Sequence, residues 1–304
     1  MKGETYMFAV SVDIGGTQTR VACIDDKGLI INKQAFRTYV DDPIRNIKEV
    51  KKIILSFEKE IIGVGMSCPG PLDLLEGTVL TPPNLPGWHY FSLRSKSEEI
   101  LSLPVFLEND ANLAALAESQ IGAGKNNNIV QYLTISTGVG GGLIINNEIF
   151  TGAHGFAQEI ANSILWKDGP KQGLLKKGSL ESISSGTAIF NRAKALGLDV
   201  RHAGHVNALA LLGDTDAIMI MEQAKDYLAN MLAIMIGVID PDIIVLGGGV
   251  VINTANFIED IEKRVKDKVY DVLRDKIKIK KAALGDDSGL IGGALHAFSK
   301  LKER

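Results

Sequence analysis

The 304-residue sequence has few cysteines and no excess of either charge. Its two cysteines, Cys23 and Cys68, lie in or beside apolar runs, so we expect buried free thiols and a reducing compartment. The 33 basic and 36 acidic residues give a net charge of −3. This balance gives no electrostatic reason to expect nucleic acid or an anionic membrane as a partner.

The sequence also lacks a long hydrophobic run. Residues 1–6 are polar, and the apolar run that follows is broken by Asp13, so no secretion signal is expected. The most apolar helical stretch, residues 231–239, is too short to cross a bilayer and follows Lys225 and Asp226. We therefore expect a cytoplasmic protein without a membrane segment.

Strand-like apolar runs alternate with helical periodicity along the chain, which is typical of α/β folds. Because 304 residues is long for one core, two domains are expected. A strand, a glycine-rich turn and further strands occur in that order twice, and this weak repeat suggests two similar halves. The first three strands are expected to form an antiparallel meander. Strands are expected at residues 8–12, 20–24, 29–36, 61–66, 104–107, 129–135, 143–145, 148–151, 243–246 and 277–284. Helices are expected at residues 43–58, 113–122, 218–239, 254–268 and 289–302, with loops at 81–88 and 152–178.

Three glycine-rich turns could bring backbone N–H groups close to an anion. The first is Gly15-Gly16-Thr17, the second covers residues 137–142, and the third is Gly247-Gly248-Gly249 after a buried strand. An ordinary hairpin turn is the alternative for the first. None of the three fits the Walker pattern or the dinucleotide-binding GxGxxG pattern, so a P-loop enzyme and a Rossmann dehydrogenase are disfavoured.

A carboxylate, Asp110, stands where a short apolar strand meets a helix. At such a junction it would lie at the end of a sheet, within reach of a substrate. The sequence around it reads Glu108-Asn109-Asp110-Ala111-Asn112. Taken alone, this stretch favours Asp110 as a helix cap. Its position between two phosphate-binding turns makes it a candidate catalytic base.

Together these motifs resemble the ROK family of sugar kinases, in order and in spacing. The matching stretches are residues 13–17, 108–112, 137–142 and 246–249, and residues 83–88 resemble a loop of glucokinase-like members. The resemblance covers essentially the whole chain. It implies the actin-like ATPase (ribonuclease H-like) fold, with two similar α/β domains and the active site between them. The expected domains are residues 1–112 with 290–304, carrying the first phosphate turn and the catalytic Asp, and residues 113–289, carrying the second turn and the adenosine motif.

The resemblance implies an ATP- and Mg²⁺-dependent hexose kinase. It would transfer the γ-phosphoryl group of ATP to the 6-hydroxyl of glucose or a related hexose, with Asp110 as general base. The sugar would be bound by Gly70, Asn84, Asn109, Asp110, Glu159, Asn162 and Glu181. The nucleotide would be bound by Asp13, Gly15, Gly16, Thr17, Thr19, Thr137, Gly138, Gly247, Gly248 and Gly249, with Asp13 holding Mg²⁺ through water. A homodimer is expected from the family.

The chain departs from the family at a structural zinc site. Many members bind zinc through a histidine and three cysteines in two nearby runs. Here the runs are residues 158–162, with Asn162 in place of the histidine, and residues 173–179, without a cysteine. We therefore predict no structural zinc. Gln158 and Ala161 stand where glycines are usual, so the loop that carries Glu159 could be reshaped and the preferred sugar is open.

Other functions stay open. An N-acetylmannosamine or N-acetylglucosamine kinase is the alternative enzyme, since some amino-sugar kinases of the family also lack the cysteines. The hypothesis of a sugar-sensing repressor has less support, because family repressors carry a helix-turn-helix of several dozen residues before the first glycine turn. Here only twelve residues precede Asp13. The hypothesis of a non-catalytic sugar-binding protein also has little support, because Asp110 and both phosphate turns are intact. His154 is expected to order a loop. His202 and His205, and the lysines at 167, 171, 176 and 177, are expected at the surface.

Overall fold

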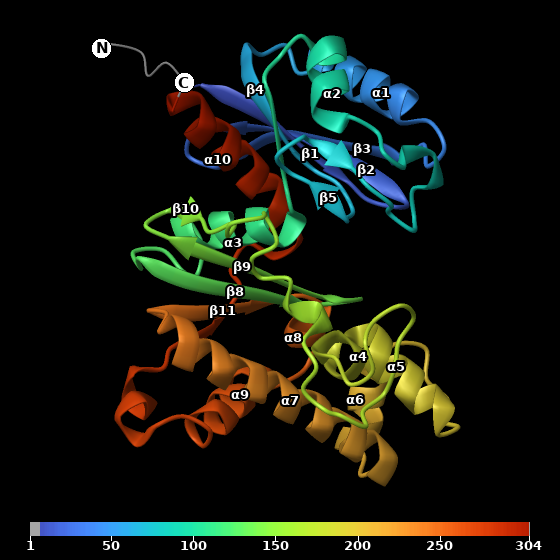
Figure 1. Ribbon diagram of the computed structural model, residues 1–304, viewed down its shortest axis with the longest axis vertical. Coiled ribbons are helices and arrows are strands. Elements are labelled where there is room, and N and C mark those ends of the chain that lie inside the picture. The colour runs from blue at the N-terminus through green and yellow to red at the C-terminus, as the bar shows by residue number, and fades with distance from the viewer. Residues whose placement is uncertain (1–6, 304) are drawn as a thin grey trace. The chain divides into compact units, whose positions relative to one another are not determined.

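The chain forms two compact units, each built on its own mixed β-sheet (Figure 1). The computed structural model describes residues 7–303, so the expectation about residues 1–6 lies outside the described residues. Unit 1 comprises Met1–Ile121, Thr151–Gly155 and Asp286–Arg304, and unit 2 comprises Gly122–Phe150 and Phe156–Gly285. Within residues 7–303, no helix has both the length and the apolar character needed to span a bilayer.

Unit 1 has a five-stranded sheet in the order β3-β2-β1-β4-β7, with helices on both faces. The strands are β1 (Phe8–Ile14), β2 (Gln18–Asp25), β3 (Ile30–Arg37), β4 (Ile61–Ser67) and β7 (Val105–Glu108). The first three form the predicted antiparallel meander, and β4 and β7 continue the sheet in parallel with β1. The main helices are α1 (Pro43–Ser56), α2 (Leu93–Leu101), α3 (Asp110–Gln120) and α10 (Ser288–Lys302). A small hairpin joins β5 (Leu72–Asp73) to β6 (Thr78–Val79).

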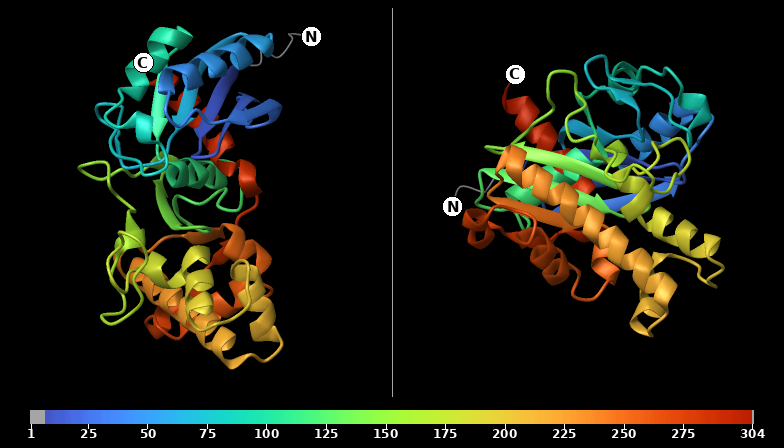
Figure 2. Two further views of the ribbon diagram at one scale, coloured as in Figure 1. Left: turned by 90° about the vertical axis from the view of Figure 1, so that its right-hand side faces the viewer. Right: turned by 60° about the horizontal axis from the view of Figure 1, so that its bottom comes forward.

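Unit 2 repeats this topology with the sheet order β10-β9-β8-β11-β12. The strands are β8 (Ile129–Ile135), β9 (Val139–Ile145), β10 (Glu148–Ile149), β11 (Ile243–Gly247) and β12 (Ile279–Lys281). Again an antiparallel meander is followed by two parallel strands. The helices are α4 (Leu180–Ser184), α5 (Gly186–Ala195), α6 (Ala203–Leu211), α7 (Thr215–Ile239), α8 (Gly249–Asn253) and α9 (Phe257–Lys266). In Figures 1 and 2 the long helix α7 runs beneath the strands of this sheet, with α4 to α6 beside it. The expected α/β class and the similar halves are confirmed.

The predicted apolar stripes form the cores of both units. The methionine-containing face of α7, with Met221, Met231 and Met235, is buried in the unit 2 core. In unit 1 both cysteines are buried free thiols, as expected. Their burial raises the pKa of each thiol, so the thiolate form is disfavoured.

Glycines let α10 approach the backbone of its neighbours in unit 1. A Cβ atom on Gly65 of β4 would lie 1.9 Å from the carbonyl oxygen of Gly293 in α10. One on Gly292 would lie 1.8 Å from the carbonyl oxygen of Leu113 in α3. Helix α10 is therefore wedged between the sheet and α3, with no room for a side chain at either contact.

Several element boundaries differ from the sequence expectation. The second glycine turn is shorter than expected, because residues 139–142 belong to β9, where Gly142 pairs with Tyr132. The helix expected at residues 254–268 is shorter in the structure, where α9 covers Phe257–Lys266, and Asn256 before it has a left-handed backbone, φ 54°. The separate short helix α8 precedes it and was not expected. The strand expected at 277–284 shortens to β12. The loop at 81–88 contains a 3₁₀ turn, Pro86–Trp88, which buries Trp88 completely.

The division between the units also differs from the expected boundaries. All of α3 belongs to unit 1, whereas the expected division fell after residue 112. The reason is the packing of α3 on α10, which holds both helices to the same sheet. The loop Thr151–Gly155 and residues 286–289 also group with unit 1.

Two glycine substitutions test this packing. Gly292→Ala in α10 should lower the free energy of unfolding by about 3 kcal/mol or more, because its Cβ would overlap a fixed backbone oxygen. The matched control is Gly237→Ala in α7, where nothing lies within 4 Å of the new Cβ. That change should raise the free energy of unfolding by about 0.5–1 kcal/mol through helix propensity. Urea unfolding of both variants measures the difference, and equal effects would contradict the close approach of α10 to α3.

Candidate active site

The first glycine turn connects β1 to β2 in unit 1. The N–H of Gly15 donates to the carbonyl oxygen of Gln18 at 2.9 Å, which closes the turn. A Cβ on Gly16 would lie 2.9 Å from the Cβ of Asn84, so the missing side chain lets the Asn84 loop approach. The structure therefore brings the predicted residues Gly16 and Asn84 together. Thr17 is exposed beside them.

Thr19 does not present its hydroxyl at this turn. The residue is completely buried, and its Oγ1 lies 3.0 Å from Oγ1 of Thr38 and 3.2 Å from Nδ2 of Asn46, which donates to it. Thr38 in turn donates its hydroxyl to the carbonyl oxygen of Gly15 at 2.7 Å. The predicted contact of Thr19 with the nucleotide is thus replaced by a buried network that supports the turn from inside.

Asp13, at the end of β1, is held by two residues that the sequence did not single out. Its Oδ2 accepts hydrogen bonds from Nε and Nη2 of Arg20 at 3.0 and 2.6 Å. Its Oδ1 accepts one from the hydroxyl of Ser67 at 2.7 Å. Arg20 on β2 and Ser67 on β4 are the strand partners of Asp13 on either side. Once β1 and β2 are read as a hairpin closed by Gly15 and Gln18, their register would have identified Arg20.

Asp110 lies in the first turn of α3 rather than at its cap. The cap is Asn109, whose Oδ1 accepts hydrogen bonds from the N–H groups of Ala111 and Asn112 at 2.8 and 3.3 Å. The capping role that the sequence suggested for Asp110 is therefore performed by Asn109. Asp110 is exposed, and its Oδ1 accepts a hydrogen bond from the N–H of Ala111 at 2.8 Å.

The surroundings of Asp110 favour the protonated acid more than its position at a helix N-terminus suggests. Desolvation by the surrounding protein, and secondly the negative charge of Asp13, raise the pKa of Asp110 above its ordinary value. The hydrogen bond from the N–H of Ala111 acts in the opposite direction and is outweighed. Because the residue remains exposed to solvent, water screens part of this effect.

Glu108, beside the candidate base, is buried. Its Oε1 accepts hydrogen bonds from Nδ2 of Asn112 at 2.9 Å and from the N–H of Asn109 at 2.8 Å. Burial raises the pKa of this carboxyl. The side chain therefore supports the turn that carries Asn109 and Asp110 from below. Gly70, which follows β4 in the same unit, is exposed.

The second glycine turn, Ser136–Gly138, connects β8 to β9 in unit 2. The predicted sugar ligand Glu181 contacts this turn directly, since its Oε2 accepts a hydrogen bond from the N–H of Val139 at 2.8 Å. A Cβ on Gly138 would lie 2.7 Å from the same oxygen. The N–H of Gly186 at the start of α5 donates to the carbonyl oxygen of Ser136 at 2.7 Å. Thus α4 and α5 together fix the conformation of the turn.

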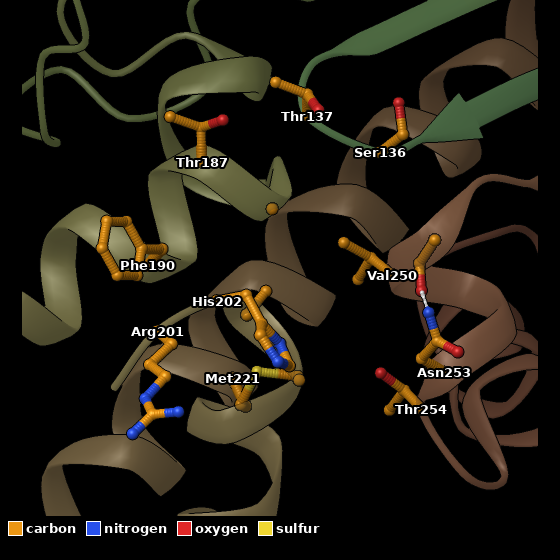
Figure 3. Close-up of a pocket in the computed structure, with 14 residues that line it drawn as sticks. Ser136, Thr137, Thr187, Phe190, Arg201, His202, Met221, Val250, Asn253 and Thr254 are labelled. Carbon is orange, nitrogen blue, oxygen red and sulfur yellow. Dashed lines mark hydrogen bonds between the residues drawn. The ribbon is translucent and has the colours of Figure 1, made fainter. Parts of the chain in front are cut away.

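A pocket of about 510 Å³ lies beside this turn in unit 2 (Figure 3). On one side it is lined by Ser136, Thr137, Gly186, Thr187 and Gly249. The sequence did not identify the residues on the other side, which come from α5, α7 and α8, from the segment before α6 and from the residue after α8: Phe190, Arg201, His202, Met221, Asn253 and Thr254. Figure 3 shows His202 and Met221 among the residues that line the pocket. The Nδ2 of Asn253 donates a hydrogen bond to the carbonyl oxygen of Gly249 at 2.8 Å. The volume and the mixed lining suit a nucleoside-sized ligand.

The three glycines of the third turn have different surroundings. Gly249 lines the pocket, whereas a Cβ on Gly247 would lie 2.7 Å from the hydroxyl of Tyr132. Gly248 has φ +90°, and a Cβ there would lie 2.4 Å from the carbonyl oxygen of Ile135. Gly247 and Gly248 are therefore required by the packing of β11 on β8, and Gly249 alone of the three faces the pocket.

The remaining predicted sugar ligands, Glu159 and Asn162, lie in unit 2 on the segment after β10. Both residues are exposed. The Oδ1 of Asn162 accepts a hydrogen bond from the backbone N–H of Lys176 at 2.8 Å. The side chain that stands in place of the family's histidine is thus engaged with the loop that follows it.

The donor set around Asp13 suits a hydrated cation better than a direct ligand bond. Each carboxylate oxygen already accepts a strong hydrogen bond, and the guanidinium of Arg20 offsets the negative charge. A water of a hydrated Mg²⁺ can still donate to the remaining lone pairs. Among residues 7–303, no group of three His, Cys, Asp or Glu side chains is arranged to hold a metal directly.

Comparisons with known proteins identify the family and the proteins that this chain resembles. Residues 9–299 match the family model described as ROK family. The chain is 31% identical to the glucokinase of Thermotoga maritima over 97% of each chain. It is 30% identical to the N-acetylmannosamine kinase of Yersinia pestis, over 96% of this chain and 99% of that one. It is also similar to the solved structure of a ROK family glucokinase from Streptomyces griseus in complex with glucose and AMPPNP, with a TM-score of 0.78, 29% identity, and coverage of 96% and 99%.

The contact between Arg20 and Asp13 can be tested through stability alone. Arg20→Gln should lower the free energy of unfolding by about 1–2 kcal/mol, because it removes two hydrogen bonds to a partly buried carboxylate and an exposed one to the carbonyl oxygen of Asp286. Arg20→Lys should recover only part of this, since an ammonium cannot make the paired contact. The control is Lys33→Gln, which removes the exposed ion pair with Asp287 and should cost less than about 0.5 kcal/mol. Urea unfolding measures all three, and an equal loss for Arg20→Gln and Lys33→Gln would refute the assignment.

Proposed function

Because the chain belongs to the ROK family and has its actin-like ATPase fold, we propose that it is an ATP-dependent sugar kinase acting on a hexose. The reaction would transfer the γ-phosphoryl group of ATP to the 6-hydroxyl of glucose or a related hexose. The observation that supports this most directly is in unit 1. There an exposed carboxylate, Asp110, follows the carboxyl end of β7, and Asp13 lies near the carboxyl end of β1, two strands away at the same edge of the sheet.

In this proposal Asp110 accepts the proton of the attacking sugar hydroxyl. A phosphoryl transfer needs placement and charge neutralisation more than covalent chemistry, so a positioned base and anion-binding turns are the groups required. The raised pKa makes Asp110 a better proton acceptor than an ordinary carboxylate. The N–H of Ala111 fixes one of its oxygens and leaves the other for the substrate hydroxyl.

Polar side chains from both units would bind the sugar. Asn84 and Asn109 come from unit 1, where the exposed Gly70 would contribute its backbone, and Glu159 and Glu181 come from unit 2. Because the Oδ1 of Asn109 caps α3, its contact with a sugar would come from the Nδ2 amide. Directional hydrogen bonds of this kind are the usual means by which proteins recognise sugar hydroxyls.

The nucleotide would be bound by the backbone of the glycine turns. Gly15, Gly16 and Thr17 would face the phosphates from unit 1, and Thr137 and Gly138 from unit 2. The nucleoside would occupy the pocket beside Gly249. Asp13 would hold Mg²⁺ through water, and bound Mg²⁺ would neutralise charge on the phosphates. We further propose a cytoplasmic homodimer, as the family resemblance suggests.

An N-acetylmannosamine or N-acetylglucosamine kinase is the second candidate. It is favoured by the 30% identity to the N-acetylmannosamine kinase of Yersinia pestis, and by residues 158–162, which lack the family's usual histidine. Asn162 is shorter than histidine and offers different hydrogen-bonding groups, so the pocket could accept a different sugar.

A coupled assay of ATP consumption tests both candidates. The purified protein is given glucose, mannose, fructose, allose, N-acetylmannosamine or N-acetylglucosamine, and we expect the highest kcat/KM with glucose. Asp110→Asn should lower kcat by about 10²–10⁴-fold on the best sugar, because it removes the base and preserves the shape. Lys33→Gln serves as the control with unchanged rate. Turnover that survives Asp110→Asn would refute the base assignment, and no turnover on any sugar would refute the kinase proposal.

The raised pKa of Asp110 predicts a specific pH dependence. The base must be ionised, so kcat/KM for the sugar should fall as acid protonates it. The midpoint should lie above the ordinary aspartate value of about 3.9. The measurement is made at saturating MgATP, and the residual activity of Asp110→Asn is followed over the same range. Protonation of ATP affects the wild-type protein and the variant alike. Therefore only a fall in the pH–rate profile that is absent from the Asp110→Asn profile can be attributed to Asp110. A midpoint at or below 3.9 would contradict the predicted direction.

A further inference from the structure

The segment that carries Glu159 is anchored at both ends within unit 2. On one side, Gln158 has a left-handed backbone with φ +69°, a conformation that is uncommon for a residue with a long side chain. Its Oε1 accepts a hydrogen bond at 2.8 Å from Nε2 of Gln131, a completely buried residue of β8. On the other side, Ile160 is buried in the unit 2 core. Glu159 is therefore flanked by one polar and one apolar anchor.

Asn162 joins the end of this segment to the loop at residues 163–179. Its Oδ1 accepts the hydrogen bond from the N–H of Lys176 at 2.8 Å, across a span of fourteen residues. The N–H of Leu180 also donates to the carbonyl oxygen of Ser163 at 2.9 Å. Two hydrogen bonds thus hold the beginning of the loop against its end.

The base of the loop is closed by backbone contacts and by an aromatic pair. The N–H groups of Leu165 and Trp166 donate to the carbonyl oxygen of Gly178 at 2.9 and 3.1 Å. Gly178 has φ +69°, and a Cβ there would lie 1.6 Å from the carbonyl oxygen of Trp166, so only glycine fits. The Trp166 ring stacks on Tyr227 of α7, with ring centroids 5.3 Å apart and planes 8° apart. The loop is therefore fixed to the long helix of the unit.

From these contacts we propose that Asn162 and Trp166 are positioning residues that form a clasp without metal and hold Glu159 in place. The clasp is the Asn162–Lys176 hydrogen bond together with the Trp166–Tyr227 stack. Asn162 thereby acts on the sugar through the loop rather than by touching the sugar. The role of Glu159 in binding the sugar rests on the proposed kinase function, whereas the order of the loop does not.

Limited trypsin digestion of the folded, full-length protein tests the clasp without any substrate. Lys171, Lys176 and Lys177 are exposed in the loop and report its opening. Trp166→Leu should raise the cleavage rate in the loop by about 3–10-fold, because loss of the aromatic pair lowers the free energy of local opening. Asn162→Ala should raise it by about 2–5-fold, since its hydrogen bond is exposed. Trp166→Phe keeps a stacking ring and Asn162→Asp keeps the acceptor oxygen, so both should stay close to wild type.

Steady-state kinetics on the same variants separate positioning from general damage. The KM for the sugar should rise several-fold in Asn162→Ala and Trp166→Leu, while the KM for ATP stays within about twofold. Leu174→Ala, at a position 98% exposed in the same loop, is the matched control and should change neither the cleavage rate nor KM. Treatment with EDTA should leave the cleavage rate unchanged, and one tightly held zinc per chain would overturn the proposal.

The outcomes are distinguishable from failure of the proposed function. A rise in sugar KM for Asn162→Ala with unchanged loop cleavage would mean direct sugar contact and would refute the clasp. Equal cleavage of Trp166→Leu and wild type would also refute it. If the wild-type protein phosphorylates no sugar, the kinase proposal fails, and the digestion still supports or overturns the clasp by itself.

Discussion

The backbone contact of α10 with β4 and α3 determines how unit 1 presents its chemistry. The strand β1, which carries Asp13 near its end, and the helix α3, which begins with Asp110, both pack against α10. Gly65, Gly292 and Gly293 bring these backbones within contact distance. A larger side chain at any of these positions would move α10 and change the spacing between the two carboxylates. The charge of one acts on the pKa of the other, so the electrostatics of the site depend on packing behind it.

Both units use the same hairpin for different purposes. In unit 1 the glycine turn carries Asp13, which is held by its neighbours on β2 and β4. In unit 2 the equivalent turn is held by Glu181 and by the start of α5, and a pocket opens beside it. The repeated topology therefore gives two glycine turns, of which one is supported by charge pairing and the other adjoins a pocket.

Much of the fold could be predicted from the sequence, and the site only in part. Apolar runs identify the strands because burial on both faces leaves a continuous hydrophobic signal. Residues next to a motif in sequence need not share its role: Thr19 turns into the core, and Asn109 takes the cap assigned to Asp110. The position of Arg20 beside Asp13 depends on strand register, and Phe190, His202 and Met221 line one pocket only after three helices have packed. These facts arise from tertiary structure, which no local pattern encodes.

The loop at residues 163–179 also determines how the protein would respond to oxidants. A cluster of zinc-bound thiolates is a target for peroxide, which oxidises the sulfur and releases the metal. Here the same region is held by an amide and two aromatic rings, which peroxide does not attack at comparable rates. The two thiols of the chain, Cys23 and Cys68, are buried in unit 1 with raised pKa values. The order of this loop is therefore independent of the redox state of any cysteine.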